Sequence, residues 1–358
     1  MWSEGITGAR IVRRAFFPLD EQLELKDKPW SAGIVKQAVW LSGIADFELA
    51  GEIMQEVGQV NISTTSIWRL SRKWGEKLKA VEVQEQAQAN QIASEQDSRT
   101  RRDVQAGRMG VAMDGTMIHI RQEGWKELKV GCVFDVLTLP TLDSQTKEWL
   151  DLGHALHSSY TCHLGGPETF GEKVWTEAKR RGWLRASDTQ VIADGAVWIW
   201  NLVMDTFYDS HQVVDWFHAK EHLVKAAYLL YDEGTPAAQR WLHEMENALF
   251  QGHAEMIALE ISQVAHRQRA AIKESALTEV GYFENNKRRM NYLDLRSDGW
   301  VIGSGMVESG GKQFRARFAG PGMHWSRPGA ESLLPIRSAV MSKRFDERWQ
   351  AASCSPII

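Results

Sequence analysis

The stretch TQVIADGAVWIWNLVMDTF, residues 189–207, decides the fold class that the sequence predicts. Its first residues are apolar and largely β-branched, they stop at Asp194 and Gly195, and the residues that follow have the apolar spacing of a helix. The stretch HQVVDWFHAKEHLVKAAYLL, residues 211–230, repeats this pattern, with a strand up to Asp215 and then a helix. Strands that alternate with helices predict an α/β protein built on one sheet.

Three more strands are predicted upstream. The alternating apolar pattern of GRMGVAMDGTMIHI, residues 107–120, indicates the first, and residues 126–139 and 158–164 indicate the second and third. A turn at residues 122–124 joins the first two as a hairpin. Residues 166–183 have the pattern of an amphipathic helix. The predicted order is therefore three antiparallel strands, a helix, a strand, a helix and a strand, forming a mixed sheet flanked by helices.

The segments on either side of these strands are predicted to be helical. Residues 77–106 contain no Gly or Pro and are rich in Gln, Ala and Glu, which predicts a polar helical connector or a dimerising arm. Residues 322–349 predict a loop and one last helix. The expected domain organisation is an N-terminal helical region (1–76), the connector (77–106), the first part of the core (107–231), an α-helical insertion (232–290) and the completion of the core (291–358).

Residues 47–78 have the pattern of a helix, a short turn and a second helix. Gly58 is expected to end the first helix, and Ser63 is a good N-cap for the second. Three cations of the second helix face away from its apolar stripe: Arg69, Arg72 and Lys73. This is the layout of a helix-turn-helix element, whose outer face meets DNA. The alternative is a plain helical hairpin with a solvated basic face.

Composition excludes several classes of protein. The chain has 358 residues, of which 43% are hydrophobic and 25% charged, as in ordinary globular proteins. Its net charge of −4 does not by itself indicate a nucleic-acid-binding protein, although a basic patch can act locally. The three cysteines are far apart and form no CxxC pair, which argues against a zinc ribbon or a disulfide framework. Dinucleotide-binding, Walker and GxSxG patterns are absent, which argues against a small-molecule enzyme.

The sequence also predicts a cytoplasmic protein. Its first residues, MWSEGITGARIVRRAF, contain neither the apolar h-region nor the small-residue cleavage site of a signal peptide. No window approaches the ~20 apolar residues that a membrane span needs.

Three carboxylates are candidates for a metal site. Asp114 lies in the first strand, Asp194 ends the fourth, and Glu308 follows the Gly-rich turn 303–305. Side chains at strand ends of an α/β sheet lie at the crevice where ligands bind, and clustered carboxylates repel unless a cation neutralises them. Oxygen ligands favour Mg²⁺ or Mn²⁺, and two such ions ~4 Å apart support phosphodiester chemistry. Each residue also has a structural explanation, because Asp-Gly pairs usually form turns and a Glu at a helix start is stabilised by the dipole.

With these carboxylates located, longer motifs resemble a known family. The segments MDGTMIHI, IADGAVWIWNL, VVDWFHAKEHL, YFENNKRRMNYLDLRSDGWVIGSGMVES and GMHWSRPGAESLLPIRS resemble bacterial insertion-sequence transposases of the DDE type, in particular the ISKra group. The resemblance covers the chain from about Phe17 to Trp349. It implies an RNase H-like catalytic core, interrupted by an α-helical insertion before the glutamate. It also implies that Asp114, Asp194 and Glu308 are the catalytic, metal-binding triad, with two Mg²⁺ (or Mn²⁺) ions as cofactors.

The activity implied by this resemblance is metal-dependent cleavage of DNA at transposon ends, followed by strand transfer into target DNA. The implied partner is double-stranded DNA, with which the protein would associate in the nucleoid. Because two ends must be paired, a homodimer or larger assembly is expected. Two alternatives have the same sequence features: a catalytically silent, transposase-derived DNA-binding protein, and an RNase H-like structure-selective nuclease.

Asp215 and His218 match the Asp-x-x-His signature that related transposases carry after the second aspartate. Their spacing of three places them on one helix face, where they can support the metal site or orient a phosphate or a flipped base. The alternative is a hydrogen-bonded pair at a helix start. A zinc site formed by His218 and His222 lacks a third ligand nearby in the sequence.

Four residues near the C-terminus are candidates for DNA contacts. Lys312, Arg315 and Arg317 follow Glu308 and are expected to hold DNA phosphates, with the arginines suited to bidentate binding. Trp325 lies beside cations and is expected to stack on unpaired bases, with a buried aromatic as the alternative.

Overall fold

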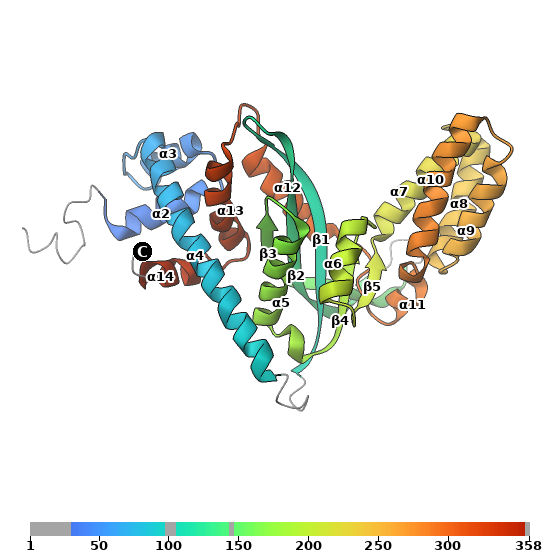
Figure 1. Ribbon diagram of the computed structural model, residues 1–358, viewed down its shortest axis with the longest axis horizontal. Helices are drawn as coiled ribbons and strands as arrows, with labels where there is room; N and C mark the ends of the chain where they lie inside the picture. Colours follow the sequence, from blue (N-terminus) through green and yellow to red (C-terminus); the bar gives the residue numbers. More distant parts are fainter. Residues whose placement is uncertain (1–29, 97–104, 143–146, 355–358) are drawn as a thin grey trace, which may run out of the picture.

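The structure is a computed structural model that describes residues 30–96, 105–142 and 147–354. Residues 1–29 of the predicted N-terminal region and 97–104 of the predicted connector lie outside this description. The chain forms an elongated molecule with N-terminal helices at one end, a β-sheet in the middle and a bundle of helices at the other end (Figure 1).

The sheet has five strands in the order β3-β2-β1-β4-β5. Strands β1, β2 and β3 are antiparallel, whereas β4 runs parallel to β1 and β5 parallel to β4. The predicted sequence of strands along the chain and the mixed sheet are therefore confirmed, although β2 and β3 are longer than expected. The strand bounds are β1 Gln105–Ile120, β2 Gly124–Leu142, β3 Trp149–His163, β4 Ala186–Ala193 and β5 His211–Val214.

Helices cover both faces of this sheet. Neighbouring side chains of a strand point to opposite faces, and on β3 Tyr160 meets Gly310 of α12, whereas Thr161 lies beside Gly131 and Val174 on the side of α5. The helices α5 (Pro167–Arg181) and α6 (Val197–Thr206) pack together, and a short 3₁₀ helix, η1 (Trp183–Arg185), follows α5. The opposite face carries α12 (Gly305–Phe318) and α13 (Arg327–Met341).

The N-terminal unit consists of α2 (Ala32–Ser42), α3 (Phe47–Glu56) and the start of α4 (Thr64–Gln96). Its small core contains the buried residues Ala38, Ala50, Met54, Ile62 and Ile67. Ser63 caps α4 as predicted, because its Oγ accepts a hydrogen bond from the backbone N–H of Ser66 at 3.2 Å. The predicted helix, turn and helix are present, and the three cations Arg69, Arg72 and Lys73 are exposed on α4.

Helix α4 does not end where the N-terminal region was expected to end. It is one continuous helix of 33 residues, which spans ~50 Å. Gly75 lies where α4 crosses α13, and a side chain there would clash with the carbonyl of Ser332. The described part of the predicted connector is also anchored on its own chain, because Glu82 pairs with Lys173 and Arg348.

The C-terminal prediction of one last helix is wrong. The chain forms two helices after residue 322, α13 and α14 (Phe345–Cys354), separated by a turn in which Lys343 adopts a positive φ of 56°. The turn directs Arg344 and Arg348 toward the carboxylates of Glu82 and Glu85 on α4.

Residues 232–290 are helical, as predicted, and form the bundle at the far end of the molecule together with the helix before them (Figure 1). The bounds are α7 Trp216–Tyr231, α8 Pro236–Phe250, α9 Ala254–Ala265, α10 Ala270–Asn286, η2 Lys287–Arg289 and α11 Tyr292–Ser297. Among the described residues, no helix combines the length and the hydropathy needed to cross a bilayer.

Candidate functional site

The register of the sheet brings three aspartates side by side. Met113 of β1 pairs with Ala193 of β4, which in turn pairs with Val214 of β5. The next residue in each segment is an aspartate: Asp114, Asp194 and Asp215, respectively. Two of the three strands end at this point, so the carboxylates of neighbouring segments lie at one edge of the sheet, where α/β proteins commonly bind ligands.

Glu308 approaches these aspartates from the opposite direction, on the first turn of α12. Gly311, three residues later on the same helix, lies so close to β1 that a Cβ would be 3.7 Å from Oδ2 of Asp114. Ser304, which precedes α12, donates a hydrogen bond from its Oγ to Oε1 of Glu308 at 3.2 Å. The Gly-rich turn thus directs the carboxylate of Glu308 toward the strand ends.

Asp114 and Glu308 line an open depression of about 630 Å³, whereas Asp194 and Asp215 are not among its lining residues. Its walls come from β1, the start of α7 and the outer face of α12. Its lining residues include Asp114, Phe217, His218, Glu308, Lys312 and Arg315, so that acids and cations lie side by side in it.

The carboxyl group of Asp114 has a raised pKa. Burial, together with the negative charges of Asp194 and Glu308, raises its pKa to about 6, against the opposing effects of the Gly115 N–H and the charge of His218. The Gly115 N–H donates to Oδ1 of Asp114 at 2.7 Å. Asp114 therefore lies within the field of the two other predicted triad members, which is the condition that a bound cation would relieve.

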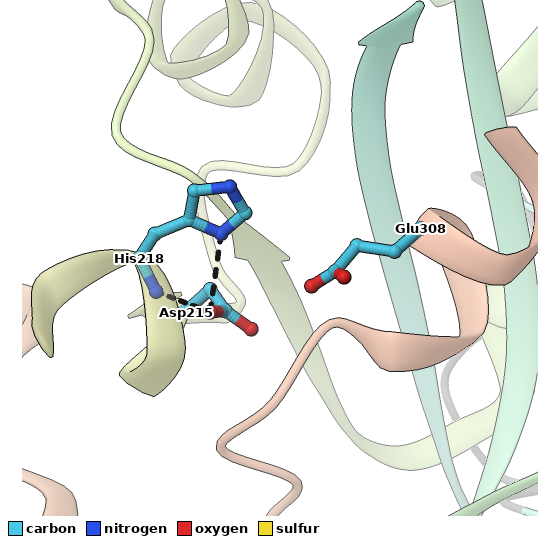
Figure 2. A group of neighbouring side chains, drawn as sticks. All are labelled: Asp215, His218 and Glu308. Carbon is cyan, nitrogen blue, oxygen red and sulfur yellow. Dashed lines mark hydrogen bonds and ion pairs between the residues drawn. The ribbon is translucent and has the colours of Figure 1, made fainter. Parts of the chain in front are cut away.

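Asp215 and His218 form a hydrogen-bonded pair at the start of α7 (Figure 2). Asp215 is fully buried, and its Oδ1 accepts from the backbone N–H of His218 at 2.7 Å and lies 3.2 Å from Nδ1 of the same residue. Its Oδ2 accepts from the backbone N–H of Ser304. Burial alone would raise the pKa of Asp215, but the hydrogen bonds from His218 and Ser304 hold it below the ordinary value. The bond to Asp215 raises the pKa of His218 to about 9, so the imidazole is protonated at neutral pH.

Two groups of side chains are candidate ligands for a divalent cation. Asp215, His218 and Glu308 offer ligand atoms that all lie within 4.8 Å of one another, and Glu308 points toward the other two (Figure 2). Both oxygens of Asp215 already accept hydrogen bonds, and the imidazole of His218 would have to lose a proton before it could bind a metal.

The predicted triad is less compact, because Asp114 and Asp194 are not in the group of described residues whose ligand atoms lie within 4.8 Å of one another. The negative charges of Asp194 and Glu308 both act on Asp114, and a divalent cation would neutralise this repulsion. A set of carboxylate oxygens suits Mg²⁺ or Mn²⁺ rather than zinc. Asp215 and His218 then hold the adjoining turn before α12 in place and provide a positive charge beside the acids.

Two of the predicted DNA-contacting cations lie at the rim of the depression. Lys312 and Arg315 are exposed on α12, and Nζ of Lys312 is 3.9 Å from Oε2 of Glu308. The three cations of α4 belong to the N-terminal unit and are not among the residues that line this depression.

The predictions for Arg317 and Trp325 as DNA contacts are wrong. Arg317 is 2% exposed, and its Nε donates to the backbone carbonyl of Ser42 at 2.8 Å, with its guanidinium 5.2 Å from the ring centroid of Trp325. Trp325 is 9% exposed, and its Nε1 donates to the carbonyl of Phe318 at 2.9 Å. Both side chains join α12 to the N-terminal unit and the core, so neither has a surface available to DNA.

Two residues of the site were not among those predicted from the sequence. Phe217 lies between Asp215 and His218 in the chain, is 60% exposed and lines the depression. An aromatic residue at the exposed position of a short polar motif was a signal for it. Tyr282 donates a hydrogen bond to the backbone carbonyl of Asp194 from 88 residues away, and no local pattern indicates such a contact. His222 pairs with Glu279 at 2.5 Å rather than joining His218 in a zinc site.

A scan against models of known protein families finds no match to this sequence, and a search of curated proteins also returns none. The functional argument therefore rests on the geometry of the acidic depression and on the motifs of the chain itself.

Proposed function

We propose that this chain is a metal-dependent DNA transposase of the DDE type, built on an RNase H-like core. One observation carries the proposal: Asp114 lies within the electrostatic reach of both Asp194 and Glu308, which are far from it in the sequence, and Asp114 and Glu308 line an open depression together with Lys312 and Arg315. The sheet supports it as well, because three antiparallel strands are followed by two parallel ones in the order β3-β2-β1-β4-β5.

In this proposal Asp114, Asp194 and Glu308 hold Mg²⁺ or Mn²⁺. When bound, a pair of such ions supplies an activated water or hydroxyl and neutralises charge on the phosphate. Lys312 and Arg315 at the rim attract and hold the DNA backbone, Arg315 with bidentate geometry. The exposed ring of Phe217 offers a surface on which a base beside the bound phosphate can stack.

The proposed reaction has two displacements at phosphorus. At a transposon end, the oxygen of water forms a bond to phosphorus while the bond to the 3′ oxygen breaks, and that oxygen takes up a proton. The freed 3′-hydroxyl then attacks a phosphodiester of the target and releases a second hydroxyl. No covalent bond between protein and DNA is needed at either step.

The N-terminal unit would bind the ends of the element. Its helix, turn and helix present Arg69, Arg72 and Lys73 on the solvent side of α4. Because two ends must be joined to one target, the active form would be a dimer or a larger assembly on DNA, acting in the bacterial cytoplasm.

A plasmid assay tests this proposal. Supercoiled plasmid carrying the DNA that flanks the coding sequence is incubated with the protein and Mg²⁺ or Mn²⁺, and nicked and joined products are separated by electrophoresis. The wild type should give both products, and Glu308→Gln should give neither while binding the plasmid equally well. Glu233→Gln, at an exposed position outside the depression, is the matched control and should behave as the wild type. Nicking by Glu308→Gln at the wild-type rate would overturn the proposal.

The same assay separates the two alternatives. Nicked plasmid without joined product would indicate an RNase H-like nuclease. Binding without any product in either metal would indicate a catalytically silent DNA-binding protein.

A further inference from the structure

Tyr282 of α10, in the helical insertion, contacts the turn that carries Asp194. Its Oη donates a hydrogen bond to the backbone carbonyl of Asp194 at 3.0 Å, while Oδ1 of Asp194 accepts from the N–H of Ala196 at 2.9 Å. Gly195 has a φ of 105°, and a Cβ at this position would lie 2.8 Å from Cε2 of Tyr282. The turn that presents Asp194 therefore fits against the ring and is fixed by the hydroxyl of the same tyrosine.

The other side of the Tyr282 ring lies against α7. It stacks on His222 with ring centroids 3.5 Å apart and an interplanar angle of 15°. Nδ1 of His222 is 2.5 Å from Oε2 of Glu279, which also belongs to α10. His222 is one helical turn after His218, so Tyr282 touches both the turn of Asp194 and the helix that carries the Asp215–His218 pair.

The direction of the hydrogen bond is fixed by its partners. A backbone carbonyl only accepts, so the hydroxyl of Tyr282 is the donor in this contact. Residues that hydrogen-bond to a metal-binding side chain and orient it affect metal affinity. A residue that holds the backbone of a metal-binding residue in place should affect metal affinity in the same way.

We infer that Tyr282 is a positioning residue for Asp194, through which the docking of the helical insertion sets the affinity of the acidic site for its divalent cation. The inference rests on the proposed function, since it assigns a regulator to the same metal site. It gives the segment 232–290 a role: when α10 leaves the Asp194 turn, the site loses cation affinity although all three carboxylates remain.

Binding of Mn²⁺ to the full-length protein tests the inference without any measurement of activity. Free Mn²⁺ is followed by electron paramagnetic resonance during titration of the wild type, Tyr282→Phe, Glu308→Gln and Tyr208→Phe. Tyr282→Phe keeps the ring and removes only the hydroxyl, and it should weaken Mn²⁺ binding about tenfold. Tyr208, which is 69% exposed after α6, makes the same chemical change away from the site and should have no effect.

The outcomes separate this inference from the proposed function. If Glu308→Gln loses Mn²⁺ binding but Tyr282→Phe binds as the wild type does, the inference is overturned and the metal site stands. If the wild type binds no Mn²⁺, or if Glu308→Gln binds it unchanged, both are overturned.

Two further measurements separate positioning from a merely structural role. Loss of packing alone would lower the unfolding temperature of Tyr282→Phe and leave its Mn²⁺ dissociation constant unchanged well below that temperature. His222→Gln removes the stacked ring from the opposite side and retains the tyrosine hydroxyl. It should also weaken Mn²⁺ binding, and unchanged binding in this variant as well as in Tyr282→Phe would contradict the inference.

Discussion

Two groups of charged side chains in this molecule each contain three carboxylates, but the charges around those carboxylates are opposite in sign. One, the acidic site, consists of Asp114, Asp194 and Glu308. The other, the paired cluster, joins α4 and α5 to the turn and helix at the C-terminus and consists of Glu82, Glu85, Glu177, Lys173, Arg344 and Arg348. The carboxylates of the paired cluster form ion pairs with cations. In the acidic site, Asp114 instead experiences the negative charges of Asp194 and Glu308.

Distances and pKa values express this difference. Lys173 lies 2.8 Å and Arg348 3.1 Å from the carboxylate of Glu82. Burial alone would raise the pKa of Glu82, but these two cations hold it below its ordinary value. Burial and neighbouring negative charge instead raise the pKa of Asp114 to about 6. Paired charges are typical of structural contacts, whereas buried like charges in a cleft indicate a functional site.

The largest effect that separates the two groups is expected for Asp114→Asn. This variant should lower the rate of plasmid nicking about a thousandfold or more, because a metal-binding carboxylate is lost. It should not lower the free energy of unfolding, since it removes repulsion. The measurements are nicking under single-turnover conditions and urea denaturation, with the exposed Asp209→Asn as the control. An active variant, or an inactive one that is strongly destabilised, would contradict the functional reading of the acidic site.

Arg348→Met should have the opposite profile. Removing this buried cation leaves Glu82 with Lys173 and Glu85 with Arg344, so each carboxylate loses one of its charged hydrogen bonds. The free energy of unfolding should fall by about 2 kcal/mol. Nicking per folded molecule should be unchanged. Urea denaturation measures the loss, and Arg240→Met on the exposed side of α8 is the control. Equal stability of the two variants would show that the paired cluster does not hold α4 to the core.

A smaller effect is expected from acid. The folded-state pKa values of Glu82 and Glu177 lie below the value of 4.5 that an unperturbed glutamate has. A lowered pKa contributes stability that is present above pH 4.5 and is lost as the pH falls through the folded-state value. Urea midpoints should therefore decrease below pH 4.5, and less so in Glu82→Gln. If the urea midpoint of Glu82→Gln decreased as steeply with falling pH as that of the wild type, the paired cluster would not be the source of the acid sensitivity.

The smallest effect concerns two arginines on one helix. Arg315→Ala, at the rim of the acidic site, should weaken DNA binding a few-fold and reduce the slope of log Kd against log salt concentration by about 1. Arg317→Ala should leave that slope unchanged and lower stability instead, because the side chain is buried. Fluorescence anisotropy over a salt series measures both, and equal slopes for the two variants would contradict the assignment.

The sequence predicts those features of this molecule that local patterns determine. Strands that end at an aspartate, as at Asp194 and Asp215, and the Gly-rich turn before Glu308 are visible in short segments, and the structure has them where they were expected. The convergence of Asp114 with Asp194 follows from strand order and register, for which the resemblance to a known fold was needed.

The wrong predictions have physical reasons. Arg315 and Arg317 are two residues apart, which corresponds to about 200° around a helix, so only one of them can share the outer face with Glu308. Helical geometry alone would have placed Arg317 on the face of the helix opposite to Glu308, toward the protein interior. The contact between Tyr282 and Asp194 spans 88 residues and depends on how the insertion docks, which no periodicity encodes.

The most direct test of the central claim is anomalous diffraction from crystals of the protein soaked in Mn²⁺. The account predicts manganese bound by carboxylate oxygens of Asp114, Asp194 and Glu308, with two ions about 4 Å apart. Manganese held by Asp215 and His218 instead, or no manganese at the depression, would contradict it.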